Sequence, residues 1–363
     1  KMRLLRNYIL KDFFSAFTFS LAIFSMVMLL GNLMKISDMI IRKGVDIVDA
    51  LKIFSFFIPY LLGFTLPLSF LLAVLLTMGR LIADNEITAI NTAGISLFKI
   101  LGIFLILGTI FSLFLFILND QVIPDFHYRY YSQIKNIYSK NITALIEPRM
   151  FLEHFRNHII YVSDKNGNKL KNVFIYELGE KKKVNKITFA KRGEFIADNN
   201  ILKLKLEDVF YHEIDSKDKK DFRGTFEVFF KDIPMEEKKS VRVEKKPSDM
   251  SLKELREKTK YLKKMGIDPV KLIGEFHKRI SFSFSIITFA ILGFGASLAI
   301  KHREKSINFG IAFLAAGAYY LLFILGEALL EYHIILPFLG MWFPNIAVIS
   351  TGGYFLYRNA HSR

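Results

Sequence analysis

The fold of this chain is decided by a long run that contains no charged side chain. Residues 53–79 read IFSFFIPYLLGFTLPLSFLLAVLLTMG, which is 27 residues in a row without Asp, Glu, Lys or Arg. A helix rises about 1.5 Å per residue, so about 20 apolar residues cross a hydrocarbon layer of about 30 Å. The run therefore predicts a transmembrane helix.

Five further uncharged runs of similar length accompany it, at residues 13–34, 100–119, 280–300, 307–326 and 334–357. One such run could be a core helix of a soluble protein, but six in one chain make that interpretation improbable. In lipid the backbone must satisfy its own hydrogen bonds, so each run is expected to be helical. The first run is longer than the core of a signal peptide and no small-x-small cleavage site follows it, so we expect it to be retained.

The composition narrows the classes of protein further. The chain is 52% hydrophobic, carries a formal net charge of +16 and has no Cys. The apolar content excludes a disordered chain. Without Cys there is no disulfide framework, thiolate catalysis or Cys-ligated zinc site. The positive charge suggests a polyanionic partner, which could be nucleic acid, anionic lipid or the membrane surface.

Charge in the short loops predicts the orientation. If the N-terminus lies inside, the inner segments are 1–12, 80–99, 301–306 and 358–363, and they hold 11 Lys and Arg. The short segments on the opposite side, 35–52 and 327–333, hold four. The positive-inside rule therefore places both termini in the cytoplasm and the long segment 120–279 outside.

That long segment has the pattern of strands rather than spans. Residues 201–207, ILKLKLE, alternate strictly between apolar and charged, as a half-buried strand does. Similar short runs occupy 150–155, 158–162, 172–178, 186–190, 209–214 and 225–231, with turn signals between them. Seven to nine short strands predict an antiparallel sandwich or jelly roll.

The chain returns to helix after the strands. Ser251 and Glu254 have the spacing of a capping box, and Gly266 is placed to end the helix that follows. Asp268 and Pro269 then fit the start of the fourth span. We therefore predict three regions, with transmembrane helices 1–3 in 1–119, an all-β domain in 120–250, and a connecting helix with helices 4–6 in 251–363.

The inner loop between the second and third spans carries the most functional information. Asp84 or Asn85 can cap a short helix within residues 80–93, and Gly94 can end it. The apolar residues of this helix form a stripe made of Leu81, Ile87 and Ile90. A short amphipathic helix with an acidic polar face favours docking to a soluble partner over lying on lipid, where Lys and Arg are preferred.

The search for catalytic motifs is negative. The sequence has no P-loop, no H-E-x-x-H and no G-x-S-x-G, so we expect neither ATP binding nor a catalytic or metal site on this chain. The six runs also lack the ionisable groups that ion-coupled carriers commonly keep within the membrane. If the protein moves a substrate, another subunit is expected to supply the energy.

The loop motif resembles a known family. Gly79–Ser96 follows the pattern G-R-L-x-x-D-N-E-I-T-A-I-x-x-A-G-I-S, which is similar to the signature of the lipopolysaccharide export permeases (the YjgP/YjgQ family, LptF and LptG). The resemblance covers the whole chain, including the external β-rich insert and the segment E-F-H-K-R at 275–279. The sequence D-N-E-I-T within this motif slightly favours LptF, although the choice between the two paralogs stays open.

The resemblance implies an ATP-driven exporter of the bacterial inner membrane, with the β domain in the periplasm. Two paralogous six-span permeases would pair on a dimer of cytoplasmic ATPase subunits, which bind ATP and Mg²⁺. Lipopolysaccharide would pass to a periplasmic bridge and to membrane-anchored Lpt components, and no nucleic acid would be bound. Glu86 would form the ion pair to the ATPase, and the rest of the coupling site would be Arg80, Leu81, Asp84, Ile87 and Ile90.

The resemblance also implies where the lipid binds. Lys35, Arg42 and Lys43 match the family's substrate-contacting basic residues in position, and cations suit lipopolysaccharide phosphates. Ordinary snorkelling anchors are an equally good interpretation of these three residues. Lys278 and Arg279 are weaker candidates, because Glu275 can pair with both at helical spacing.

Three alternatives remain open at this point. The chain could be a membrane-anchored scaffold whose external domain does the work, but a scaffold has no need of a cytoplasmic docking helix. It could be a force-transmitting ABC permease that does not itself move lipid. Only the presence of a lipid-sized cavity would distinguish an exporter from such a permease. An independent membrane enzyme is disfavoured by the missing catalytic motifs.

Overall fold

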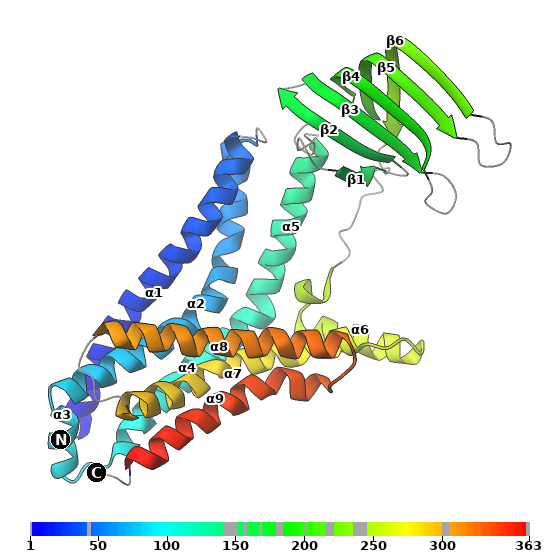
Figure 1. Cartoon of the computed structure of the whole chain (residues 1–363). Helices are drawn as coiled ribbons and strands as arrows, with labels where there is room; N and C mark the ends of the chain where they lie inside the picture. The colour runs from blue at the N-terminus through cyan, green and yellow to red at the C-terminus, as the bar shows by residue number, and fades with distance from the viewer. Residues whose placement is uncertain are drawn as a thin grey trace. The chain divides into compact units, whose positions relative to one another are not determined.

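The computed structural model describes residues 2–41, 45–140, 151–155, 158–166, 169–178, 184–198, 201–214, 221–234, 245–299 and 305–360. The chain forms two compact units (Figure 1). The helical unit consists of Lys1–Met34, Ile53–Tyr131 and Lys245–Arg363, and the sheet unit consists of Lys35–Lys52 and Ser132–Glu244.

Long helices account for most of the described residues. They are α1 (Met2–Ile41), α2 (Ile47–Ala83), α3 (Glu86–Thr92), α4 (Leu97–Ile117), α5 (Ile123–Lys140), α6 (Leu252–Lys264), α7 (Val270–Ala299), α8 (Lys305–Glu331) and α9 (Pro337–Ala360). A π-helical turn, η1 (Leu118–Val122), joins α4 to α5, and a 3-10 turn, η4 (Pro247–Asp249), precedes α6.

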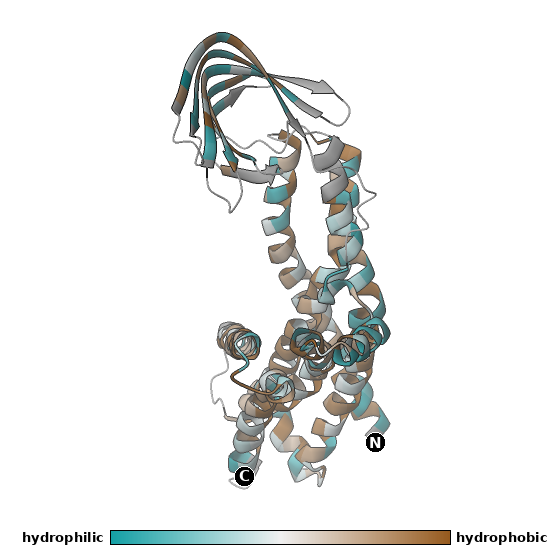
Figure 2. Cartoon of the chain, turned by 90° about the vertical axis from the view of Figure 1, so that its right-hand side faces the viewer, coloured by the Kyte–Doolittle hydropathy of each residue, from teal (hydrophilic) through white to brown (hydrophobic). Residues whose placement is uncertain are grey.

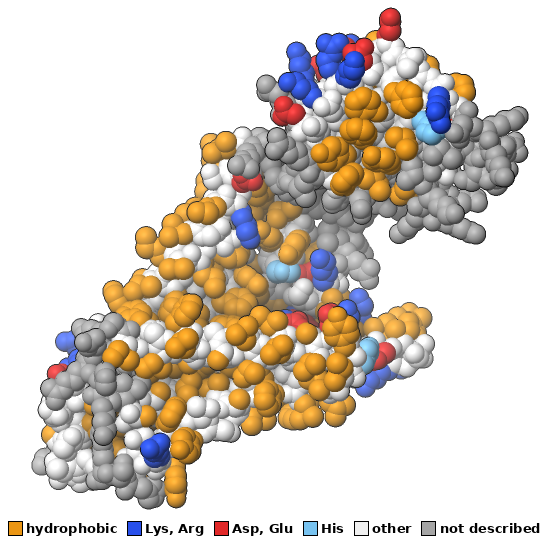
Figure 3. Space-filling model, in the orientation of Figure 1, with side chains coloured by type: hydrophobic (Ala, Val, Ile, Leu, Met, Phe, Trp, Pro, Cys, Tyr) orange, Lys and Arg blue, Asp and Glu red, His pale blue; other side chains and the backbone are white. Residues whose placement is uncertain are grey.

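Five helical stretches of the described chain are long and apolar enough to cross a membrane, namely Arg3–Ile41, Ile47–Ala83, Leu97–Ile134, Val270–Ala299 and Ile307–Glu331. They correspond to the first five predicted spans. The face of the helical unit seen in Figure 3 is accordingly dominated by hydrophobic side chains.

The sixth predicted span, 334–357, coincides with α9, which does not reach the same apolar level. Pro344, Asn345 and two adjacent glycines lower its mean hydropathy. Gly352 serves close packing instead, because a Cβ on Gly295 of α7 would collide with the carbonyl oxygen of Gly352. Small residues of this kind let helix backbones approach closely within membranes.

The helices α7, α8 and α9 share a buried polar network. The Asn345 side chain donates to the Ser281 carbonyl oxygen at 2.8 Å and to its hydroxyl oxygen at 2.7 Å. The hydroxyls of Thr288 and Tyr319 donate to the Asn345 side-chain oxygen at 3.3 and 3.4 Å. A fully bonded network of this kind fixes the relative positions of the helices that it joins.

The third span continues beyond the point where the sequence places the start of the β domain. The chain stays helical through Asp120 and as far as Lys140. Asp120 has a structural role here, since its carboxylate accepts a hydrogen bond at 2.7 Å from the backbone N–H of Leu252, at the start of α6. The described strands begin only at Phe151.

The residues predicted to start and end α6 and to start α7 are confirmed in these roles. The Ser251 side chain accepts from the backbone N–H of Glu254, and the Glu254 carboxylate accepts from that of Ser251, which completes the capping box. Gly266 ends the helix with a φ of 71°. The Asp268 carboxylate accepts from the Val270 N–H at 3.1 Å at the start of α7.

Six described strands form one antiparallel sheet in sequential order: β1 (Phe151–Phe155), β2 (His158–Asn166), β3 (Lys169–Leu178), β4 (Val184–Asp198), β5 (Ile201–Ile214) and β6 (Asp221–Pro234). Every run predicted to be a strand coincides with one of them over its described residues, residue 150 lying outside these, but two of those runs lie in the same strand, β5. The described strands follow a meander, whereas a jelly roll requires strands that cross between two sheets.

The alternation of side chains breaks along one row of this sheet. The strand pairings skip Asn172, Lys191 and Asp208, which lie on neighbouring strands. Asn172 and Asp208 have φ values of 48° and 54°, a conformation that Asn and Asp tolerate better than most residues. Buried residues on either side of the row are three positions apart instead of two, as for Leu170 and Val173 or Leu206 and Val209.

This offset keeps apolar side chains on one face of the sheet along its whole length. They form a single buried cluster made of Ile160, Val162, Leu170, Val173, Ile175, Ala190, Leu204, Leu206 and Val209. The strands curve strongly (Figure 2). The sheet is therefore a bent layer whose buried apolar cluster lies on one face, while a row of aromatic rings from Phe151, Tyr161, Phe174 and Phe189 lies on the other.

Candidate functional site

One polar cluster joins α1, α2 and α3 at the end of the helical unit where α2 meets α3. Arg80, in the last turn of α2, binds the Asp12 carboxylate and donates to the Tyr8 hydroxyl oxygen at 3.0 Å. The Tyr8 hydroxyl in turn donates to the Glu86 carboxylate at 2.8 Å. The Arg80 guanidinium also lies 3.6 Å from Glu86 and 3.8 Å from Asp84.

The charges of this Arg80 cluster do not balance. Among the described residues one guanidinium faces the three carboxylates of Asp12, Asp84 and Glu86, which leaves two negative charges in excess. The Asp84 and Glu86 side chains are 54% and 29% exposed, so a second molecule can reach both. The cluster is therefore a surface that a cationic partner complements.

The apolar residues of the predicted docking helix point into the helical unit. Leu81 and Ile87 are 0% and 2% exposed and belong to the same core cluster as Ile9 and Phe13 of α1. Ile90 is half-buried against that cluster. Periodicity identified the apolar stripe but not what covers it, and here the chain's own helices cover it. The surface left to a partner is the polar one.

The bounds of α3 agree with the sequence in part. Asn85 is the N-cap, but its backbone is left-handed with a φ of 57° and its side chain makes no capping bond. Gly94 ends the segment as predicted, with a φ of 80°, and the Ile95 N–H donates back to the Ile90 carbonyl oxygen at 3.2 Å. This left-handed termination fixes the direction in which the chain enters α4.

A second charged cluster lies at the other end of the helical unit from the Arg80 cluster, where α7 begins and α8 ends. The Lys278 ammonium donates to the two Glu327 oxygens at 2.7 and 3.0 Å and lies 3.9 Å from Glu275. Lys271 pairs with Glu331 at 3.0 Å. Lys278 is 33% exposed, so an anion could reach it only in competition with Glu327.

Arg279 belongs to the same end but lies inside the protein, where its side chain is 6% exposed. Its guanidinium binds Glu275 at 3.0 Å and donates to the carbonyl oxygens of Pro247, Ser248 and Met250. It thereby anchors the turn η4, where the chain returns from the strands. In this arrangement its donors are engaged with the protein rather than presented to a ligand.

The remaining predicted cations belong to the sheet unit. Lys35 is an exposed residue of α1. Arg42 and Lys43 lie outside the described residues, so their predicted role stays a prediction. No group of three or more His, Cys, Asp or Glu side chains in the described chain is arranged to hold a metal ion.

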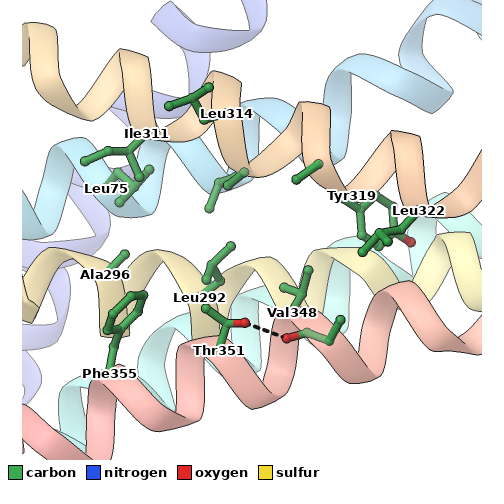
Figure 4. Close-up of a pocket in the computed structure, with 14 residues that line it drawn as sticks. Leu75, Leu292, Ala296, Ile311, Leu314, Tyr319, Leu322, Val348, Thr351 and Phe355 are labelled. Atoms are coloured by element: carbon green, nitrogen blue, oxygen red, sulfur yellow. Dashed lines mark hydrogen bonds between the residues drawn. The ribbon is translucent and has the colours of Figure 1, made fainter.

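An apolar cavity of about 300 Å³ opens among α2, α7, α8 and α9. Its walls are mainly aliphatic, and Leu292, Leu314 and Val348 approach it from three different helices (Figure 4). The Thr351 hydroxyl in its wall donates to the Ala347 carbonyl oxygen at 2.8 Å, so that polar group is satisfied within α9. Such a cavity suits hydrocarbon and not a polar solute.

Apolar helices long enough to span a membrane, an inserted sheet and an acidic cluster beside a short helix at one end of the bundle define a multi-pass membrane protein. The family model described as lipopolysaccharide export system permease LptF/LptG matches residues 7–358. The chain therefore belongs to the LptF/LptG family. Comparison with individual curated proteins gives no match.

Family membership gives the chain its general role. It is a multi-pass inner-membrane protein and a permease, a transport component of lipopolysaccharide export in an ABC system. The family implies ABC partners and a paralogous permease.

Two residues of the Arg80 cluster were not found from the sequence. Tyr8 and Asp12 lie 78 and 68 residues from the groups that they bind, and no spacing rule connects them. Their one signal is a separation of four, which puts both on the same face of a helix that begins before the first span.

Proposed function

We propose that this chain is the permease subunit of an ATP-driven transporter that extracts lipopolysaccharide from the inner membrane and passes it to a periplasmic bridge. The observation that carries the proposal is the Arg80 cluster, where excess carboxylate charge is exposed beside α3 in a chain of the LptF/LptG family. A soluble ATPase with a cation at its docking surface would complement that charge.

In the proposed orientation of the chain in the membrane, the Arg80 cluster lies in the cytoplasm and the sheet in the periplasm. The excess of Lys and Arg in the segments assigned to the inside supports this choice. ATP and Mg²⁺ would be bound by the ATPase subunits. Their closure would drive the paired permeases, and the bent sheet, with its apolar face, would receive the acyl chains.

Lipid recognition in this proposal rests on cations near the outer membrane boundary. Lys35 is exposed and can meet a phosphate directly, together with Arg42 and Lys43, which follow it in sequence. Lys278 would bind phosphate only after exchanging its Glu327 partner. Arg279 would act on this site by holding η4 and Glu275 in place.

The proposal is tested by replacing the exposed acid of α3. Glu86→Ala removes the carboxylate expected to meet the ATPase, so co-purification of the ATPase in mild detergent should fall at least tenfold while the permease stays folded. Glu257→Ala, which removes an exposed carboxylate from α6, is the matched control. Mass spectrometry of the purified complex reports ATPase, paralog and lipopolysaccharide together.

Retention of the ATPase at the parent level in Glu86→Ala would contradict the coupling role. A parent chain that purifies without any ATPase, after detergent stripping has been excluded, would favour a scaffold. A complex that contains the ATPase but neither binds nor releases lipopolysaccharide would favour a force-transmitting permease.

A further inference from the structure

The helix α1 is held less tightly than its neighbours in the helical unit. In its most apolar 18-residue window 17% of the residues are buried, compared with 78% for α2 and α7, 39% for the stretch Leu97–Ile134 and 28% for α8. Large side chains such as Phe19, Met26 and Val27 are more than half exposed. The protein can therefore displace α1 without opening its main core.

The contacts that do hold α1 are concentrated near its beginning. Its buried residues in the helical unit are Ile9, Phe13, Phe17 and Ser20. The Phe13 ring packs on the rings of Phe70 and Phe104, with centroids 5.1 and 5.9 Å apart. The rest of the helix up to Met34 has no fully buried side chain among the described residues.

The Arg80 cluster lies at this same attachment. Tyr8 and Asp12 flank Ile9 and project from α1 toward Arg80, and Tyr8 also reaches Glu86 at the start of α3. The first turn of α3 is thus connected to α1 directly by the Tyr8–Glu86 hydrogen bond, and indirectly through Arg80 of α2, which binds both Tyr8 and Asp12. A displacement of α3 has a direct path to the weakly held helix.

We propose that Arg80 is a positioning residue that transmits displacement of α3 to α1 through Tyr8 and Asp12. The inference rests on the proposed function, because the docked ATPase supplies the displacement. When a cation of the ATPase pairs with Glu86, Arg80 remains bound to Asp12, and movement of the end of α2 with α3 pulls on α1 near its attachment. The exposed remainder of α1 then tilts as a helix.

The links are poorly suited to a purely structural role. Arg80 and Asp12 are 35% and 25% exposed, and partly exposed ion pairs contribute little to folding. The buried Ile9 and Phe13 already attach α1 to the core. The Arg80 Nε has no hydrogen-bond partner among the described residues.

Spin labels can test this inference because the chain has no Cys of its own. Phe19→Cys on α1 and Ile110→Cys on α4 introduce two labels at exposed positions. The distance between them is measured in the reconstituted complex with the ATPase and the paralogous permease, with and without a non-hydrolysable ATP analogue. We expect the nucleotide to change this distance in the parent chain.

The double variant Tyr8→Phe with Asp12→Asn should keep the ATPase bound, since Glu86 and Asp84 are intact. It should lose at least half of the distance change, and lipopolysaccharide released per ATP hydrolysed should fall about tenfold. Lys99→Gln, which removes an exposed cation of α4 outside the cluster, is the matched control and should behave as the parent does.

An unchanged distance in the parent, or parent-like release per ATP in the double variant, would overturn the inference. If the double variant fails to assemble, the single variants Tyr8→Phe and Asp12→Asn each keep one link. Both should then show partial loss of release, and parent-like release in both would again overturn it. Failure of the proposed function is distinguished by Glu86→Ala, which tests docking and not transmission.

Discussion

The two charged ends of the helical unit are built from the same residue types but balanced differently. At one end a single cation, Arg80, faces three carboxylates. At the other, three cations face three carboxylates, in the pairs Lys271–Glu331, Lys278–Glu327, Lys278–Glu275 and Arg279–Glu275. Among the described residues the first cluster therefore has an excess of carboxylates, whereas the cations and carboxylates of the second are equal in number. A ligand at the second end must displace a carboxylate before it can bind.

The largest effect is expected from replacing Arg279, the buried cation of the balanced cluster. Arg279→Ala leaves the Glu275 carboxylate and three carbonyl oxygens without their donor, at a cost of about 3–5 kcal/mol. Thermal unfolding of the lipid-free, detergent-solubilised protein should show a large drop in the midpoint. Lys271→Ala, which breaks an exposed pair of the same cluster, is the control and should change stability by less than about 1 kcal/mol.

An unchanged midpoint for Arg279→Ala would mean that the guanidinium is free to serve a ligand. In that case the loss should appear only in lipopolysaccharide binding.

A smaller effect is expected from salt at the unbalanced end. Raising the ionic strength from about 0.05 M to about 0.5 M shortens the screening length severalfold and should weaken ATPase docking about tenfold. The unfolding midpoint of the permease alone should hardly move, because the exposed pairs at the other end contribute little to folding and Arg279 is buried. Titration of the ATPase at the two salt concentrations measures this. Docking that is indifferent to salt would imply an apolar interface and remove the basis of the comparison.

The smallest effect is expected from releasing one cation at the balanced end. Glu327→Gln removes the carboxylate that holds Lys278, so retention of lipopolysaccharide on purification should rise about fivefold, or about 1 kcal/mol. Quantitative mass spectrometry of bound lipid is the measurement. Glu331→Gln, whose partner Lys271 is 72% exposed, controls for the change in net charge. Equal retention in both variants would assign no phosphate contact to Lys278.

The sequence predicted the features that are local in the chain. Uncharged runs located five spanning helices and the position of α9. Residue spacing predicted the capping box at Ser251 and the helix ends at Gly94 and Gly266. Alternation of apolar and polar residues located the strands. Each of these depends on neighbours within about one helical turn or one strand.

What the sequence missed depends on packing between distant segments. The stripe with Leu81 and Ile87 was expected to meet a partner, but α1 and α4 cover it. Arg279 was a candidate ligand for phosphate, but η4 returns beside it and takes up its donors. Neither outcome follows from periodicity, because a hydrophobic or charged face does not state what lies opposite.

The offset row through Asn172, Lys191 and Asp208 has a consequence for recognition along the sheet. Consider a strand that pairs with β6 along its full length. At Glu227, the residue opposite Asp208, the β6 side chains that point to the inner face of the sheet shift by one position from strict alternation. A partner with uninterrupted alternation would match β6 on one side of that row and present the wrong face on the other. The row would therefore disfavour pairing along the whole of β6 by a strand that lacks the same three-residue step.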